Sequence, residues 1–186
     1  MSYKWHRWDT HTVHGVRMNR DELEVELTRE HPDAFAWAVR CTLGNREEAE
    51  DTLHAAYERI LSGRAQFDGR SSFRTWLFGV VRLTAMEQHR RGWLRLARLQ
   101  AWFAREPMQV HQAADAVVER ETSEQLKSAL RQLSRRQQEM MHLVFYQELS
   151  VQEAAAVLGI PVGTARTHYE RGKARLRSLL SGMDRP

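Results

Sequence analysis

The sequence predicts an all-α protein with two small helical domains joined by a flexible linker. Only four prolines and ten glycines occur in 186 residues, and apolar residues recur at helical spacing almost throughout, with no long alternation typical of strands. A hydrophobic content of 42% is enough for two small cores and excludes a disordered tail.

Three amphipathic helices are expected to share the first core. The first ends at Gly44, and the second begins at once with a capping-box pattern from Asn45 to Glu48. The second ends at Ser62-Gly63, and Ser71-Ser72 opens the third. Their apolar stripes comprise, in order, Phe35, Ala38, Val39, Thr42 and Leu43; Ala49, Leu53, Ala56, Tyr57, Ile60 and Leu61; and Phe73, Trp76, Leu77, Val80 and Val81.

The helical pattern loosens from about Gly92 to Val118, which predicts the interdomain linker. Within it, Leu94–Glu106 has the composition of a mixed apolar and basic helix, which Pro107 would end. Periodicity returns at Leu126, Leu130 and Leu133. The segment 135–146 follows, and it predicts a helix buried at the centre of a second domain because its apolar residues face almost all round. These are Met140, Met141, Leu143, Val144 and Phe145.

The end of the chain predicts a helix-turn-helix. A capping box from Ser150 to Glu153 opens a short helix, the segment Gly159-Ile-Pro161 breaks it, and another helix starts near Val162. The expected division is an extension at 1–19, a first domain at 20–92, a linker at 93–120 and a second domain at 121–182.

Charge is segregated along the chain although the total is only +4. Residues 21–61 carry eleven acids against four arginines, and residues 64–105 carry nine arginines against two acids. The last helix, 162–178, has a net charge of +4. This pattern indicates nucleic acid on one side and a basic protein partner on the other, with a merely solvated acidic helix as the alternative.

The last predicted helix has one apolar and one polar face. Its stripe of Ala165, Tyr169, Gly172, Leu176 and Leu179 leaves the opposite face to side chains that can contact base edges or phosphates. These are Thr164, Thr167, His168, Arg171 and Arg175, flanked by Arg166, Lys173 and Arg177. The alternative is an ordinary amphipathic helix with a solvated basic face.

The middle of the chain carries aromatic and basic residues together. Phe73 and Trp76 lie on the apolar stripe, so we assign them to the core and not to base stacking. The exposed candidates for DNA contact are Phe67, Asp68, Arg70 and Ser71 in the loop, then Arg74 and Arg82 on the polar face of the third helix.

Taken in order, the motifs resemble those of a known family. They are Glu48-Ala-Glu-Asp51, the run from Phe67 to Leu77 (FDGRSSFRTWL), the run from Leu133 to Leu143 (LSRRQQEMMHL), and LGIPVGTAR from Leu158 followed by KARLR from Lys173. Together they resemble the extracytoplasmic-function sigma factors of bacterial RNA polymerase, over about residues 21–182. The resemblance implies a sigma region 2 helical bundle, a linker and a sigma region 4 helix-turn-helix, with no catalytic residues.

The resemblance also implies three binding surfaces. Core polymerase would bind Glu50, Asp51, His54 and Glu58. The melted minus-ten strand would bind Phe67, Asp68, Arg70, Ser71, Ser72, Arg74, Arg82, Arg90 and Arg91. The minus-thirty-five duplex would bind Thr164, Arg166, Thr167, His168, Arg171, Lys173 and Arg175. The implied partners are core RNA polymerase, promoter DNA and an inhibitory anti-sigma factor, bound by a chain that is otherwise a monomer.

Three features depart from the family pattern. His54-Ala55 replaces a usual Gln-Glu, which removes a carboxylate and an amide from the docking face. Leu83 stands where an Asn is common, which predicts a different promoter preference. The extension before about Arg20 carries Trp5, Trp8, His6, His11 and His14. We expect no metal site there, because a flexible tail rarely preorganises ligands and no acid or cysteine joins the cluster at suitable spacing.

Other classes of function are disfavoured. A dimeric helix-turn-helix regulator acting without polymerase would not need the acidic first half, although a former sigma factor that has lost core binding is compatible with His54-Ala55. An enzyme is not expected, since no paired acids, phosphate loop or activated nucleophile is found, and no cofactor is expected. The single cysteine, Cys41, predicts a buried thiol in a reducing compartment, and no apolar run is long enough to span a membrane, so we expect a cytoplasmic protein.

Overall fold

The computed structural model describes residues 18–102, 126 and 128–181, and those residues form helices and turns without any strand. The all-α prediction is therefore confirmed. The principal elements are α1 (Arg20–Cys41), α2 (Arg46–Leu61), α3 (Phe73–Trp102), α5 (Arg135–Met141), the π-helix η1 (His142–Tyr146), α6 (Val151–Leu158) and α7 (Val162–Ser181).

The helix starts follow from side-chain caps that the local sequence supplies. Asn19 and Glu22 form a reciprocal capping box at α1, and Ser150 and Glu153 form the predicted one at α6. At α2, the Asn45 side chain accepts a hydrogen bond from the backbone N–H of Glu48 at 3.2 Å. Each cap satisfies a backbone N–H that the first turn leaves without a helical partner.

Two elements differ from the expectation. Helix α3 runs through Gly92 to Trp102 without a break, since one mid-helix glycine costs only about 1 kcal/mol. The segment expected to be buried all round ends in η1, where Phe145 and Tyr146 are 61% and 66% exposed. A π-helical turn has a wider repeat than an α-helix, so the side chains at its end leave the buried stripe.

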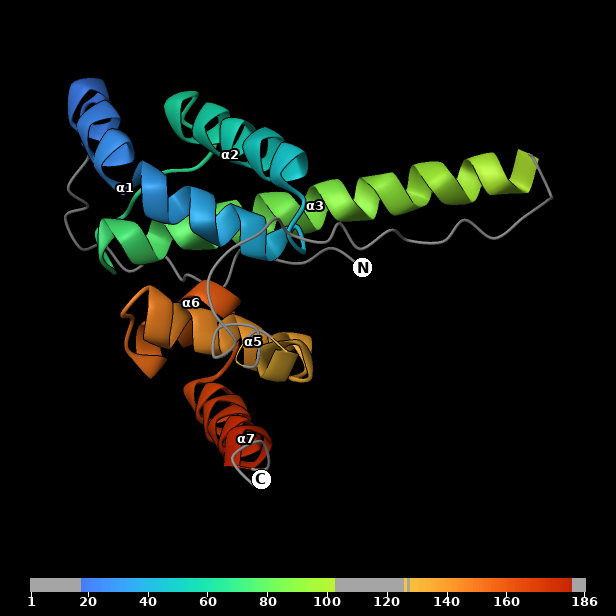
Figure 1. The fold of residues 1–186 in the computed structure, drawn as a ribbon. Helices are drawn as coiled ribbons and strands as arrows, with labels where there is room; N and C mark the ends of the chain where they lie inside the picture. The colour runs from blue at the N-terminus through green and yellow to red at the C-terminus, as the bar shows by residue number, and fades with distance from the viewer. Residues whose placement is uncertain (1–17, 103–125, 127, 182–186) are drawn as a thin grey trace.

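The helices form two packed groups that share one contiguous hydrophobic core (Figure 1). Helices α1, α2 and α3 pack against one another, and the fully buried Trp37 of α1 donates its Nε1–H to the carbonyl of Phe78 on α3 at 3.0 Å. Below them, α6 packs against α3, and α7 packs against α5 and α6 on the side away from the first group. The fold thus presents α2 and α7 at opposite ends of the molecule.

Candidate polymerase and promoter interfaces

An acidic row lies along the outer face of α2. Glu50, Asp51, His54 and Glu58 are all exposed and follow the spacing of one helix face. Glu58 pairs with Arg64 at 2.7 Å, and behind the row Arg59 pairs with Glu87 of α3 at 2.7 Å. The row is therefore held on a helix fixed to the core, which suits docking onto a basic protein surface.

The loop between α2 and α3 is ordered by an aromatic cluster. The ring of Phe67 lies 5.6 Å from that of Phe73 and 5.4 Å from that of Trp76, between centroids. Phe73 is buried and Trp76 half-buried, which confirms their assignment to the core. Phe67, expected to be exposed, is half-buried because it packs on both rings. The polar residues Asp68, Arg70, Ser71 and Ser72 occupy the rest of the loop, where Arg70 pairs with Asp68 at 3.3 Å.

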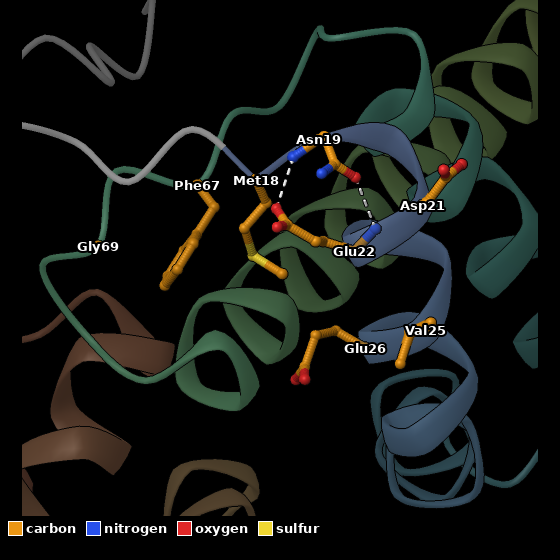
Figure 2. A pocket seen from close by; sticks show the side chains of 8 residues that line it. All are labelled: Met18, Asn19, Asp21, Glu22, Val25, Glu26, Phe67 and Gly69. Atoms are coloured by element: carbon orange, nitrogen blue, oxygen red, sulfur yellow. Dashed lines mark hydrogen bonds between the residues drawn. The ribbon is translucent and has the colours of Figure 1, made fainter.

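A pocket of about 700 Å³ opens between this loop and the start of α1 (Figure 2). Phe67 and Gly69 line it on the loop side, while Met18, Glu22 and Glu26 are among the residues that line it on the other. Its wall is mostly apolar, with carboxylates at the margin. The sequence indicated the loop but not the residues from α1, because nothing in the local pattern of a helix start shows which loop will pack beside it.

Two arginines expected on an open polar face of α3 lie instead between the two groups of helices. Arg74 Nη2 donates to Asp33 of α1 and to Gln147 Oε1 at 3.2 Å. The Arg82 side chain is only 11% exposed and lies 3.7 Å from the carboxylate of Glu139. Arg82 is therefore nearly buried and Arg74 only half-buried, because acidic residues of α1 and the second domain pack on this face. Arg90 and Arg91, further along α3, are exposed as expected.

Helices α6 and α7 form the predicted helix-turn-helix. The turn is made at Gly159, whose left-handed backbone (φ 62°, ψ 38°) ends α6. On α7 the buried or half-buried stripe matches the prediction, and the opposite face is open. Of the predicted duplex-binding residues, Thr164, Arg166, Thr167, Arg171 and Arg175 are exposed, and His168 and Lys173 are half-buried.

The depth of α7 in this domain is set at Gly172. A Cβ atom at this position would lie 2.8 Å from Cε of Met141 and 3.3 Å from Cβ of Gln137, both on α5. Only glycine allows this close approach without movement of a neighbour.

Comparisons with known proteins identify the family of this chain. The model of sigma-70 region 2 matches residues 27–95, and that of sigma-70 region 4 matches residues 123–176, so together they cover most of the chain. The chain is a sigma-70 family member of the extracytoplasmic-function group. Its activity is to direct promoter recognition and transcription initiation with core RNA polymerase.

Similar proteins match this sigma factor over most of its length. The extracytoplasmic-function sigma factor SigX of Bacillus subtilis is 28% identical, with 72% of this chain and 71% of SigX covered. The sigma factor YlaC of the same organism is 26% identical over 88% of this chain and 94% of its own. The structure of sigma factor RpoE in complex with the anti-sigma factor NepR from Bartonella quintana has a TM-score of 0.66 at 25% identity, covering 89% of this chain and 99% of that chain.

The cysteine, the histidines and the possibility of a membrane span were also singled out from the sequence. Cys41 is buried, and burial raises the pKa of its thiol to about 12, which disfavours the reactive thiolate while the thiol stays covered. The described residues include no cluster of side chains that could hold a metal ion, and His6, His11 and His14 lie outside them. None of the described helices is long and apolar enough to cross a membrane.

Proposed function

We propose that this sigma factor divides promoter recognition among three surfaces. The acidic row of α2 docks on core polymerase, the loop at 67–72 and α3 hold the melted minus-ten strand, and α7 reads the minus-thirty-five element. The observation that carries this division is α7, where groove-reading side chains are exposed opposite a buried stripe and directly after a left-handed glycine. The chain acts without catalytic residues or a cofactor of its own.

The pocket beside the loop suits one unstacked base of the minus-ten strand. The Phe67 ring offers an apolar face for stacking, and Met18 supports the opposite wall. The carboxylates of Glu22 and Glu26 can accept hydrogen bonds from an exocyclic amine, which only some bases carry. Arg90 and Arg91 are placed along α3 to meet the phosphates of the same strand or of the adjacent duplex.

An anti-sigma factor is the proposed regulator. The solved sigma factor RpoE, which resembles this chain, is bound to the anti-sigma factor NepR. A partner of this kind would compete with polymerase or DNA for the same surfaces. We place the protein in the cytoplasm, where polymerase and promoters are.

The docking surface is tested by reversing one charge on α2. We expect Asp51→Arg to weaken binding of the full chain to core RNA polymerase by roughly tenfold or more, because a basic side chain would face a basic surface. Binding is measured by fluorescence anisotropy without DNA and in moderate salt. Glu24→Arg on α1 is the matched control, since it makes the same charge change at an exposed site outside the row.

The binding of core polymerase by the unmodified chain and by its two variants separates docking through α2 from the alternatives. Loss of binding in Asp51→Arg with normal binding in Glu24→Arg supports docking through α2 despite His54-Ala55. If the unmodified chain does not bind core polymerase, its docking has been lost, and the DNA-binding regulator becomes the better description. A dimer in size-exclusion chromatography with light scattering would favour that regulator further.

The reading helix is tested with a pair of arginines. We expect Arg171→Ala to weaken binding to promoter duplex by roughly 1–3 kcal/mol and to relax discrimination between bases, with core binding unchanged. Arg177→Ala, which flanks the reading face, should lower affinity for all sequences alike by reducing phosphate contact. Titrations of promoter and base-substituted duplexes at two salt concentrations separate these effects. Equal discrimination in both variants would show that α7 does not read bases.

A further inference from the structure

The second domain covers part of the strand-binding face of α3. Helix α6 packs against α3, and α5 and η1 reach α1 (Figure 1). The His142 ring stacks on the fully buried ring of Trp37 with their centroids 5.4 Å apart. Arg135 Nη2 also donates to the backbone carbonyl of Cys41 at 3.4 Å. The contact thus joins the two domains through both apolar and polar groups.

A buried carboxylate lies at the centre of the polar part. The side chain of Glu139 on α5 is 3% exposed, and its Oε2 lies 3.0 Å from Arg136 Nη1 and 3.7 Å from Arg82 Nη2. Arg135 approaches the other oxygen at 3.4 Å. Arg82 therefore faces an anion supplied by its own chain, in the place where the proposed function puts a DNA phosphate.

The same contact engages Arg74, the second arginine proposed for the strand. Its guanidinium meets Glu30 and Asp33 of α1, and Nη2 donates to Gln147, which is 1% exposed in the second domain. Two of the proposed strand-binding cations are thus bound to groups of the protein in this arrangement. A strand approaching this stretch of α3 would have to displace the second domain.

Some hydrogen-bond donors in the contact between the two domains are buried without an acceptor, which favours a contact that can open and close reversibly. Arg40 and Arg82, two of the first domain's arginines in this contact, each bury an Nε–H that makes no hydrogen bond with the described residues. Burial also lowers the pKa of Arg40 and Arg82. Buried donors without partners weaken an interface, and opening would return the Nε–H groups of Arg40 and Arg82 to water.

We propose that the second domain is an intramolecular cover for the strand-binding face of α3, with the Glu139 carboxylate occupying Arg82 in place of a DNA phosphate. The closed chain must open before α3 can hold a melted strand. The cover leaves the acidic row of α2 and the reading face of α7 exposed, so core polymerase and duplex DNA can bind first. This inference rests on the proposed function for its assignment of α3.

The single cysteine provides a reporter of closure. Cys41 is buried at the edge of the contact, and it is the only thiol in the 186 residues. In the full chain we expect Glu139→Gln to raise the rate of Cys41 alkylation by iodoacetamide and the affinity for a fluorescent single-stranded oligodeoxynucleotide, each by about tenfold. Arg136→Gln is the control, since it removes a partner of Glu139 within the second domain and leaves the contact with Arg82.

A second measurement needs no substitution. Binding and opening are linked, so an excess of the oligonucleotide should accelerate alkylation of Cys41 in the unmodified chain. An alkylation rate that neither the oligonucleotide nor Glu139→Gln changes would overturn the cover. If Glu139→Gln speeds alkylation of Cys41 but does not tighten binding of the oligonucleotide, then the two domains do close on each other but the covered face of α3 does not bind the strand. That result would contradict the proposed function of α3 and not the closure itself.

Discussion

At the scale of single residues, His142 shows how packing determines charge. Its ring lies between Trp37 and Tyr146, with centroids at 5.4 and 5.0 Å, and it approaches Gln147 Nε2 at 3.4 Å. Burial lowers the pKa of His142 to about 4, and the positive charge of Arg40 on α1 adds to this effect. The residue is therefore neutral in the folded protein throughout the physiological range.

This lowered pKa predicts a pH dependence of stability. The unfolded chain takes up a proton at His142 below about pH 6.5, but the folded chain does so only near pH 4. The free energy of unfolding should therefore fall as the pH drops from 6.5 to 4, by at most roughly 3 kcal/mol from this group, and change no further from it below pH 4. Urea unfolding at several pH values measures this.

The control for that measurement is His142→Gln, which keeps a polar side chain but does not titrate. Subtracting its pH profile from that of the unmodified protein removes the contributions of the other titrating groups. A flat difference between pH 6.5 and 4 would contradict a lowered pKa at this site.

At the scale of elements, the turn between α6 and α7 depends on one backbone conformation. Gly159 and Gly163 both have no atom near the position that a Cβ would take. They differ in the backbone, because Gly159 has a positive φ of 62° and Gly163 is a helical residue of α7. We expect Gly159→Ala to destabilise the second domain by about 1–2 kcal/mol, because a side chain disfavours the left-handed region. Gly163→Ala should be neutral or slightly stabilising.

Thermal unfolding followed by circular dichroism compares these two glycine variants. Equal melting temperatures would show that backbone conformation at Gly159 does not limit stability. The comparison also separates strain from crowding, since neither position has a neighbour within contact distance of an added methyl group.

At the scale of the whole molecule, the sequence was sufficient for structure within each domain but not for contacts between domains. Periodicity and caps predicted the helices and most of their buried stripes, because these signals come from residues close in sequence. The contact between Arg82 and Glu139 left no such signal. A charged residue on the polar side of a helix has the same local pattern whether water or another domain covers it.

The sequence predicted the reading surface on α7 but not the pocket beside Phe67, because only the first is made of residues that are close in sequence. The residues of α7 lie on one helix, so their spacing alone places them together. The pocket combines the start of α1 with a loop more than forty residues later, and only the packed fold brings Met18 to Phe67.

The missing side chain at Gly172 lets α7 lie close against α5. A Cβ atom there would lie 2.8 Å from Cε of Met141, the end of a flexible side chain, and 3.3 Å from Cβ of Gln137. A larger residue at this position would therefore have to be accommodated first by Met141 and Gln137, so the seat of the reading helix depends on how two side chains of its neighbour pack as well as on its own apolar stripe.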